Sequence, residues 1–95
     1  MNLTITQTQI LEMAVKYMME NDSEFCLVPA HPSSIGALGK TGLITHHESP
    51  NGYVCIQELK RYTFRLTMAG VLHCAYEFED FGAYLESKLD DSLTN

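Results

Sequence analysis

The stretch GLITHHESPNGYVCIQELKRYTFRL, residues 42–66, decides the fold class of this chain. Three runs within it, Leu43–Thr45, Tyr53–Ile56 and Tyr62–Leu66, are rich in β-branched and aromatic residues. Runs of this composition are typical of short β-strands. The polar segment His46–Gly52 between the first two runs ends in Asn-Gly, which is a strong turn signal. The stretch therefore predicts a short strand followed by an antiparallel hairpin.

A helix is predicted on the N-terminal side of this stretch, over Thr6–Glu20. Apolar residues recur there at the helical period, and Thr6 and Gln9 have the spacing of a capping box. The segment Asn21–Ser23 is expected to end the helix. Its buried stripe is expected to consist of Ile10, Leu11, Ala14, Val15 and Met18.

The segment that follows leaves two structures open. Phe25–Val28 has the composition of either a short strand or one helical turn. Pro29 and Pro32 then interrupt any regular structure around them.

A second, short helix is predicted from Pro32 to Gly42. Proline suits the first position of a helix, and glycine commonly ends one. Ile35 and Leu38 are expected to face inward. Gly36 and Gly39 weaken this helix by roughly 1 kcal/mol each relative to alanine.

Helical structure is also predicted after the strands. Thr67 can cap a helix over Met68–Tyr76, and the pattern continues as helix over Glu77–Leu89. Apolar residues follow one side of this continuation and acidic residues the other. The apolar side consists of Phe78, Phe81, Leu85 and Leu89. Residues Asp90–Asn95 are expected to form a frayed tail.

These elements predict a single domain over residues 1–95. The chain has 95 residues, of which 45% are apolar and 19% are charged, and this composition is that of a folded globular domain. Helices packed on a short antiparallel hairpin, with an acidic helix at the C-terminus, belong to the α+β class.

Two stretches of the chain resemble the winged helix-turn-helix family. Leu38 is followed after three residues by Gly42-Leu43-Ile44, as at the end of that family's recognition helix. Residues 64–70, Phe-Arg-Leu-Thr-Met-Ala-Gly, match the family's entry from the second wing strand into its last helix. The resemblance covers residues 6–76. The chain departs from the family at Phe25–Pro32, where two prolines stand in place of a clean amphipathic second helix.

The resemblance implies a small DNA-binding transcriptional regulator of winged-helix type. The residues expected to face the major groove are Ser33, Ser34, Ala37, Lys40 and Thr41. Those expected to line the wing and contact phosphates are His46, His47, Asn51, Lys60 and Arg61. The four Lys and Arg side chains of residues 29–65 would let one copy of the chain bind DNA only weakly. A homodimer is therefore expected on duplex DNA.

The distribution of charge fits this expectation, although the net charge of the chain is −6. Residues 29–65 contain four Lys or Arg and two acids, a net charge of +2. Residues 1–28 carry −3 and residues 66–95 carry −5. Binding to phosphates needs such a local excess of cations.

The acidic C-terminal helix favours a different hypothesis, in which the chain is a protein-binding inhibitor or adaptor. Phage-encoded proteins directed at host nucleic-acid machinery use surfaces of this kind. The partner-binding residues would be Glu77, Glu79, Asp80, Tyr84 and Glu86. Alternatively the acids form a solvated face. The apolar side of this helix would pack on the first helix or on a second copy of the chain.

Catalysis, cofactors and metals are not expected. Gly39-Lys40-Thr41 lacks the glycine of a phosphate-binding loop, since Ser34 occupies its position. The four histidines and three cysteines show no metal-ligand spacing, so the cysteines are interpreted as reduced and buried, and His73 as hydrogen-bonded and partly buried. No apolar run approaches a membrane span, and the first residues lack a secretory signal. A cytoplasmic location is therefore expected.

Overall fold

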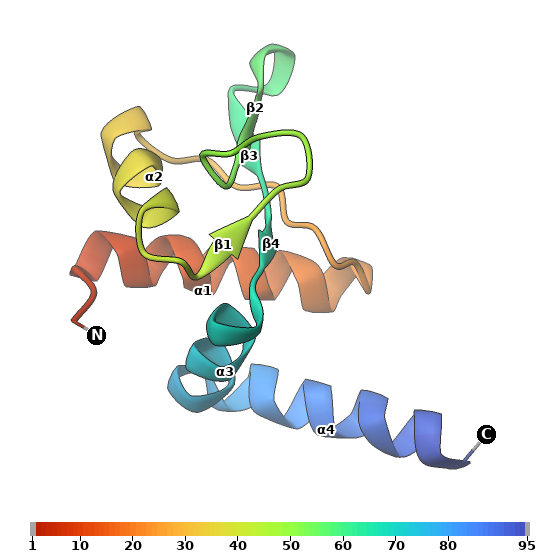
Figure 1. Cartoon of the computed structure of the whole chain (residues 1–95). Helices are drawn as coiled ribbons and strands as arrows, with labels where there is room; N and C mark the ends of the chain where they lie inside the picture. The colour runs from red at the N-terminus through yellow and green to blue at the C-terminus, as the bar shows by residue number, and fades with distance from the viewer. Residues whose placement is uncertain (1, 95) are drawn as a thin grey trace.

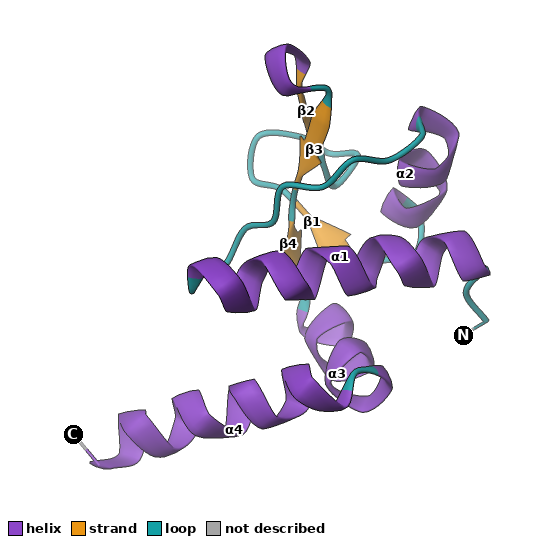
Figure 2. Ribbon diagram, turned by 180° about the vertical axis from the view of Figure 1, so that it is seen from behind, coloured by secondary structure: helices purple, strands orange, loops and turns teal. Residues whose placement is uncertain are grey.

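The computed structural model of the chain describes residues 2–94 and has the predicted α+β class. The elements in chain order are α1 Ile5–Asn21, α2 Pro32–Gly39, β1 Ile44–Thr45, β2 Val54–Ile56, the 3-10 turn η1 Gln57–Leu59, β3 Arg61–Thr63, β4 Arg65–Leu66, α3 Met68–Glu77 and α4 Glu79–Thr94. Helix α1 crosses the middle of the molecule (Figure 1). Helix α2 and the strands lie on one side of α1, while α3 and α4 lie on the other (Figures 1 and 2).

Helix α1 begins with a capping box two residues earlier than the predicted one. The Thr4 hydroxyl accepts the N–H of Gln7 at 3.1 Å, and the Gln7 side chain accepts the N–H of Thr4 at 2.9 Å. The predicted pair Thr6 and Gln9 is wrong, because both residues lie inside the helix. The predicted apolar stripe is buried as expected. The helix ends at Asn21, and the capping residue Asp22 has a left-handed backbone (φ 48°).

The segment left open by the sequence, Phe25–Val28, is extended. The N–H of Cys26 donates to the Phe64 carbonyl at 3.0 Å, and Val28 exchanges two hydrogen bonds with Tyr62 at 2.9 and 2.8 Å. These bonds satisfy the backbone of a segment that Pro29 prevents from continuing as a helix. Helices α1 and α2 are therefore joined by an extended connection.

The strands form two short antiparallel ladders, β1 with β4 and β2 with β3. The predicted strand Tyr62–Leu66 is divided at Phe64, which is completely buried and separates β3 from β4. The β2–β3 hairpin projects from the rest of the molecule, with η1 at its tip (Figure 1). The run Arg61–Leu66 thus contributes one strand to each ladder, and Phe64, between the two strands, is buried in the core.

The predicted continuous helix after Thr67 is wrong, because the chain bends at Phe78 (φ −117°, ψ 103°). Thr67 caps α3 as predicted, since its hydroxyl accepts the N–H of Gly70 at 3.1 Å and donates to the Gly42 carbonyl at 2.7 Å. The bend folds α4 back to pack against α3 and α1, and it buries Phe81. Glu77 consequently ends α3 rather than starting the acidic helix.

Helix α4 continues through the region predicted to be a frayed tail. It extends to Thr94, and Asn95 lies outside the described residues. Glu79 and Asp80 occupy its first turn, where acidic side chains interact favourably with the helix dipole. None of the helices described within residues 2–94 combines the length and apolar composition needed to cross a membrane.

Candidate nucleic-acid interface

Helix α2, the expected recognition helix, is short and closed at both ends by local hydrogen bonds. At its start the His31 ring nitrogen accepts the N–H of Ser33 at 3.2 Å, and Pro32 occupies the first turn. The helix ends at Gly39 and not at the predicted Gly42, which lies in the following loop with φ 80°. Its buried side chains are the predicted Ile35 and Leu38.

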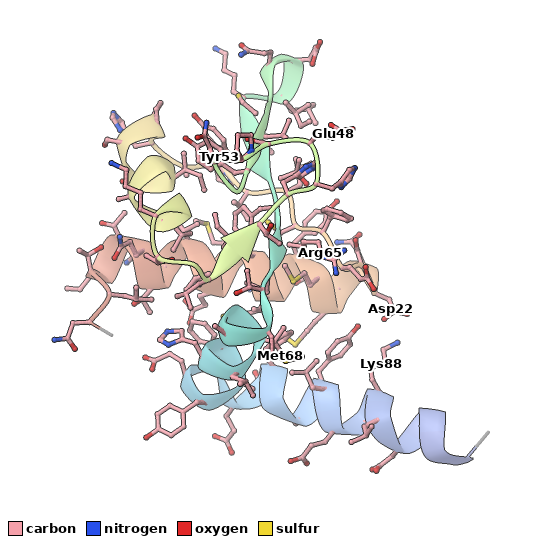
Figure 3. The ribbon with its side chains drawn as sticks, in the orientation of Figure 1. Asp22, Glu48, Tyr53, Arg65, Met68 and Lys88 are labelled. Carbon is pink, nitrogen blue, oxygen red and sulfur yellow. The ribbon has the colours of Figure 1, made fainter. Side chains whose placement is uncertain are left out.

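The two glycines of α2 face the loop before the hairpin. A Cβ atom at Gly39 would overlap the carbonyl oxygen of Asn51 and lie 3.1 Å from the Tyr53 ring. At Gly36 the nearest atom would be the Tyr53 hydroxyl oxygen at 3.7 Å, an ordinary contact. Tyr53 lies between α2 and the hairpin (Figure 3). Gly39 therefore lets α2 pack closely on the segment that positions the hairpin.

This packing predicts opposite signs for two alanine substitutions in one helix. Gly39→Ala should lower the free energy of unfolding by about 2 kcal/mol, because the added methyl group collides with backbone. Gly36→Ala should raise it by about 0.5–1 kcal/mol through improved helix propensity. Urea unfolding followed by circular dichroism measures both. Equal effects of the two substitutions would contradict the close approach at Gly39.

Few of the residues expected to read bases present a long polar side chain. Ser33, Ala37 and Lys40 are exposed, whereas Ser34 and Thr41 are half-buried. The Ser33 hydroxyl lies 2.8 Å from the His31 ring nitrogen. The Thr41 hydroxyl donates to the Leu38 carbonyl at 2.7 Å. Lys40 is therefore the one long polar side chain of this set, which fits backbone contact better than base recognition.

The two adjacent histidines differ in their surroundings. His46 is buried, its ring nitrogen accepts the N–H of Glu48 at 3.0 Å, and its ring stacks on His47 with centroids 4.7 Å apart. Phe25 packs against both rings. The burial of the His46 ring therefore argues against the phosphate contact expected of it. His47 and Asn51 remain exposed, and His47 Nε2 lies 3.7 Å from Oε1 of Glu48.

The hairpin carries two of the expected cations and one exposed acid, Glu58 of η1. Lys60 and Arg61 are exposed directly after η1, and Lys60 has a left-handed backbone (φ 52°). Among the described residues, neither these two nor Lys40 has a carboxylate oxygen within 4.0 Å. The three cations are thus available to an anionic partner.

The cations nearer the other end are paired with acids. Lys88 of α4 approaches Asp22 to 2.5 Å, and Arg65 lies 3.9 Å from Glu24. The Tyr84 hydroxyl also donates to Asp22 at 2.5 Å. The hydrogen bonds from Lys88 and then Tyr84 lower the pKa of Asp22, and the bond to Asp22 raises the pKa of Tyr84. Tyr84, one of the expected partner-binding residues, is therefore half-buried and bonded within the chain.

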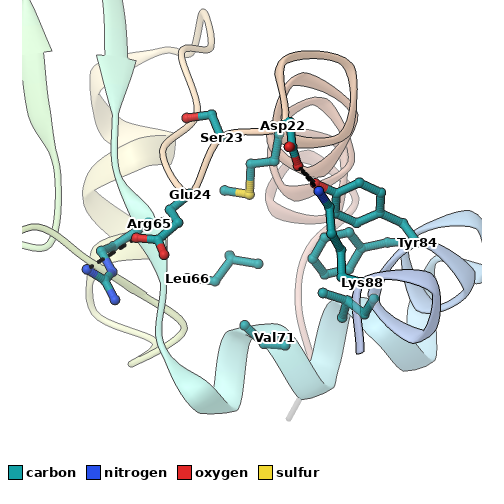
Figure 4. A pocket seen from close by; sticks show the side chains of 11 residues that line it. Asp22, Ser23, Glu24, Arg65, Leu66, Val71, Tyr84 and Lys88 are labelled. Atoms are coloured by element: carbon teal, nitrogen blue, oxygen red, sulfur yellow. Dashed lines mark hydrogen bonds and ion pairs between the residues drawn. The ribbon is translucent and has the colours of Figure 1, made fainter. Parts of the chain in front are cut away.

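These two ion pairs stand on opposite sides of a cleft of about 500 Å³ (Figure 4). The cleft lies between the end of α1, strand β4 and helices α3 and α4. Its apolar lining consists of Met18, Leu66, Val71, Phe81 and Leu85, and its polar lining of Asp22, Ser23, Glu24, Arg65, Tyr84 and Lys88. No local sequence pattern indicates this cleft, because it forms only where four elements meet.

The acidic surface predicted for the C-terminal helix spans two helices. Its exposed acids are Glu77 on α3 and Glu79, Asp80, Glu86 and Asp90 on α4. An exposed apolar stripe along α3 lies beside this acidic surface and was not predicted. Its signal was present in the sequence as the spacing i, i+4, i+8 of Met68, Leu72 and Tyr76.

The thiol and imidazole groups show no nucleophilic arrangement. Burial raises the pKa of both Cys26 and Cys74 to about 12, so these thiols are protonated at neutral pH. His73 is expected to be hydrogen-bonded. This prediction is wrong for its Nε2 atom, which is buried without a hydrogen-bond partner in the described structure. Among the described side chains, no three His, Cys, Asp or Glu come together as a metal site requires.

Compared with protein-family models, with curated proteins and with solved structures, the chain matches none.

Proposed function

We propose that the chain is a non-catalytic module that binds the phosphate backbone of duplex DNA through the end formed by α2 and the β2–β3 hairpin. The observation that carries this proposal is the separation of charge along the molecule. Lys40, Lys60 and Arg61 are exposed at this end without carboxylate partners and outnumber its two exposed acids, Glu48 and Glu58, whereas five exposed acids of the described part of the chain gather on α3 and α4. Such a molecule presents its cationic end to a polyanion and turns its acidic end away.

The proposal assigns the chain a winged-helix architecture in which the hairpin is the wing. The order of α1, α2, the paired strands and α3 supports this assignment, as does the projection of the hairpin (Figure 1). The connection 22–31, which contains the extended run Phe25–Val28, takes the place of the family's second helix. With α2 offering one long polar side chain, the module contacts backbone and discriminates little between sequences.

Three cationic contacts predict weak binding by one copy of the chain. A dissociation constant in the range typical of non-specific DNA binding, about 10⁻⁴ to 10⁻⁶ M, is expected at physiological salt. A homodimer would double the number of cations and bind more tightly. Regulation of transcription would follow if this end were brought to a particular DNA site by dimerisation or by a second protein.

Reversal of two charges tests the proposal. Lys40→Glu combined with Arg61→Glu should weaken binding to a labelled duplex by roughly tenfold or more, because both side chains then repel phosphates. Fluorescence anisotropy measures the affinity, and circular dichroism checks that the exposed substitutions leave the fold intact.

The matched control for a single charge reversal is Lys16→Glu on α1. Lys16, like Arg61, is exposed and has no carboxylate oxygen within 4.0 Å in the described structure. Arg61→Glu and Lys16→Glu change the net charge equally, so Arg61→Glu should have the larger effect. Equal losses would indicate a response to net charge alone and would contradict binding through the hairpin.

A further inference from the structure

Helix α3 exposes a row of large apolar side chains at the end of the molecule opposite the hairpin. Met68 is 76% exposed, Leu72 65% and Tyr76 90%. Residues at i, i+4 and i+8 lie above one another on a helix, so the three form one continuous stripe. Met68 is the first residue of α3, two residues after the end of β4 (Figure 3). Isolated exposed apolar residues are common, but three in line on one helix indicate an interaction surface.

The stripe makes no contribution to the core, because α3 packs through its other side. Gly70 and Cys74 are buried on that side, and Gly70 lies against the Leu43 carbonyl just before β1 and against Leu66 of β4. The stripe is therefore available without any change in the fold. Methionine and tyrosine are also among the residue types enriched in protein interfaces.

The cleft of Figure 4 borders α3 through Val71, while Met68, Leu72 and Tyr76 of the stripe lie outside its lining. Val71 lines the cleft and lies roughly 60° around α3 from Met68, at 3.6 residues per turn. Val71 lies about 100° from Leu72 and about 140° from Tyr76, so a helix on the stripe can reach this cleft only at the Met68 end. Side chains that fill such pockets supply much of the binding energy at protein interfaces.

The charge beside the stripe determines what kind of partner fits it. Glu77 ends α3, and Glu79 and Asp80 begin α4, so acids border the Tyr76 end of the stripe. No Lys or Arg occurs on α3, and Lys88 of α4 is paired with Asp22. A second copy of the chain would bring no cation of α3 to these acids, whereas a partner rich in Lys and Arg would be attracted.

We infer that the α3 stripe is a docking surface for an amphipathic helix of another protein, with apolar side chains along one face and Lys or Arg along its borders. The acids steer and orient this helix, and the stripe with the adjoining cleft holds its apolar face. The surface lies away from Lys40, Lys60 and Arg61, so one chain can hold this partner and DNA together. Docking at this surface does not require DNA binding at the other end.

Two synthetic helical peptides of about 18 residues test this inference. Both carry Leu, Leu and Phe at i, i+4 and i+8, with lysine borders in one and glutamate borders in the other. Titrated with the full chain and followed by fluorescence anisotropy, the lysine peptide should bind about tenfold or more tightly than the glutamate peptide. Absence of binding by the lysine peptide would overturn the inference.

Variants of the chain separate the stripe from general electrostatic attraction. Leu72→Ser combined with Tyr76→Ser should weaken binding of the lysine peptide by about tenfold or more. Leu59→Ser removes a comparably exposed apolar side chain at the hairpin tip and should leave the affinity unchanged. Equal binding of the lysine peptide by the unaltered chain, the double variant and Leu59→Ser would overturn the inference. So would sedimentation data showing a dimer of the chain that the double substitution dissociates, because a second copy would then cover the stripe.

Discussion

Gly70→Ala is expected to lower the free energy of unfolding by about 3 kcal/mol, although it places a better helix former in the first turns of α3. A Cβ atom at Gly70 would overlap the carbonyl oxygen of Leu43 and lie 3.2 Å from the Cβ of Leu66. These atoms belong to the β1–β4 ladder and the residue before it, so the clash can be relieved only by moving α3 away from the strands. Urea unfolding followed by circular dichroism measures the change.

The sign of the change in unfolding free energy distinguishes a steric clash at Gly70 from an effect of helix propensity. Helix propensity alone predicts that Gly70→Ala stabilises the protein by up to about 1 kcal/mol. Ala69→Ser, at the exposed neighbouring position, is the control and should change stability by no more than about 0.5 kcal/mol. A neutral or stabilising Gly70→Ala would contradict the packing of α3 on the strands.

Phe64→Ala is expected to have a larger effect, a loss of about 4 kcal/mol in the free energy of unfolding. The Phe64 side chain is completely buried, and its carbonyl accepts the N–H of Cys26. The substitution leaves a cavity where β3 and β4 meet the segment that follows α1. A small domain has only about 5–15 kcal/mol of stability, so the variant would keep as little as about 1 kcal/mol and its melting temperature would fall sharply.

The control for Phe64→Ala is Phe64→Leu, which retains most of the buried apolar volume. We expect it to cost about 1 kcal/mol. Differential scanning calorimetry of both variants should therefore show a much lower melting temperature for alanine than for leucine. Similar melting temperatures for the two variants would mean that Phe64 does not anchor the junction of the two ladders.

Sequence patterns correctly predicted those elements that depend on residues close together in the chain. The stripe of α1, the hairpin and the Thr67 cap all depend on residues within a few positions of one another, and each is present. The capping box was misplaced because Thr4 with Gln7 and Thr6 with Gln9 have identical spacing. Nothing in the local sequence distinguishes the two pairs.

Contacts distant in sequence determined the features that were not predicted. Phe25–Val28 is extended because Tyr62 and Phe64 supply its hydrogen-bond partners. The bend at Phe78 has neither proline nor glycine to mark it, and apolar periodicity alone continues across it. In the candidate interface, exposure of Lys60 and Arg61 agrees with expectation, whereas the burial of His46 depends on its packing against Phe25. The α3 stripe was visible as a spacing, but only the packing of α3 reveals which face is exposed.

The salt dependence of DNA binding tests the central claim most directly. The purified chain is titrated into a labelled 20-base-pair duplex at several salt concentrations between roughly 20 and 200 mM, and anisotropy gives each association constant. If Lys40, Lys60 and Arg61 contact phosphates, the logarithm of the association constant should fall with the logarithm of the salt concentration with a slope of about −3 per chain. A second duplex of unrelated sequence should give the same slope. No binding at the lowest salt, or a slope near zero, would contradict the account.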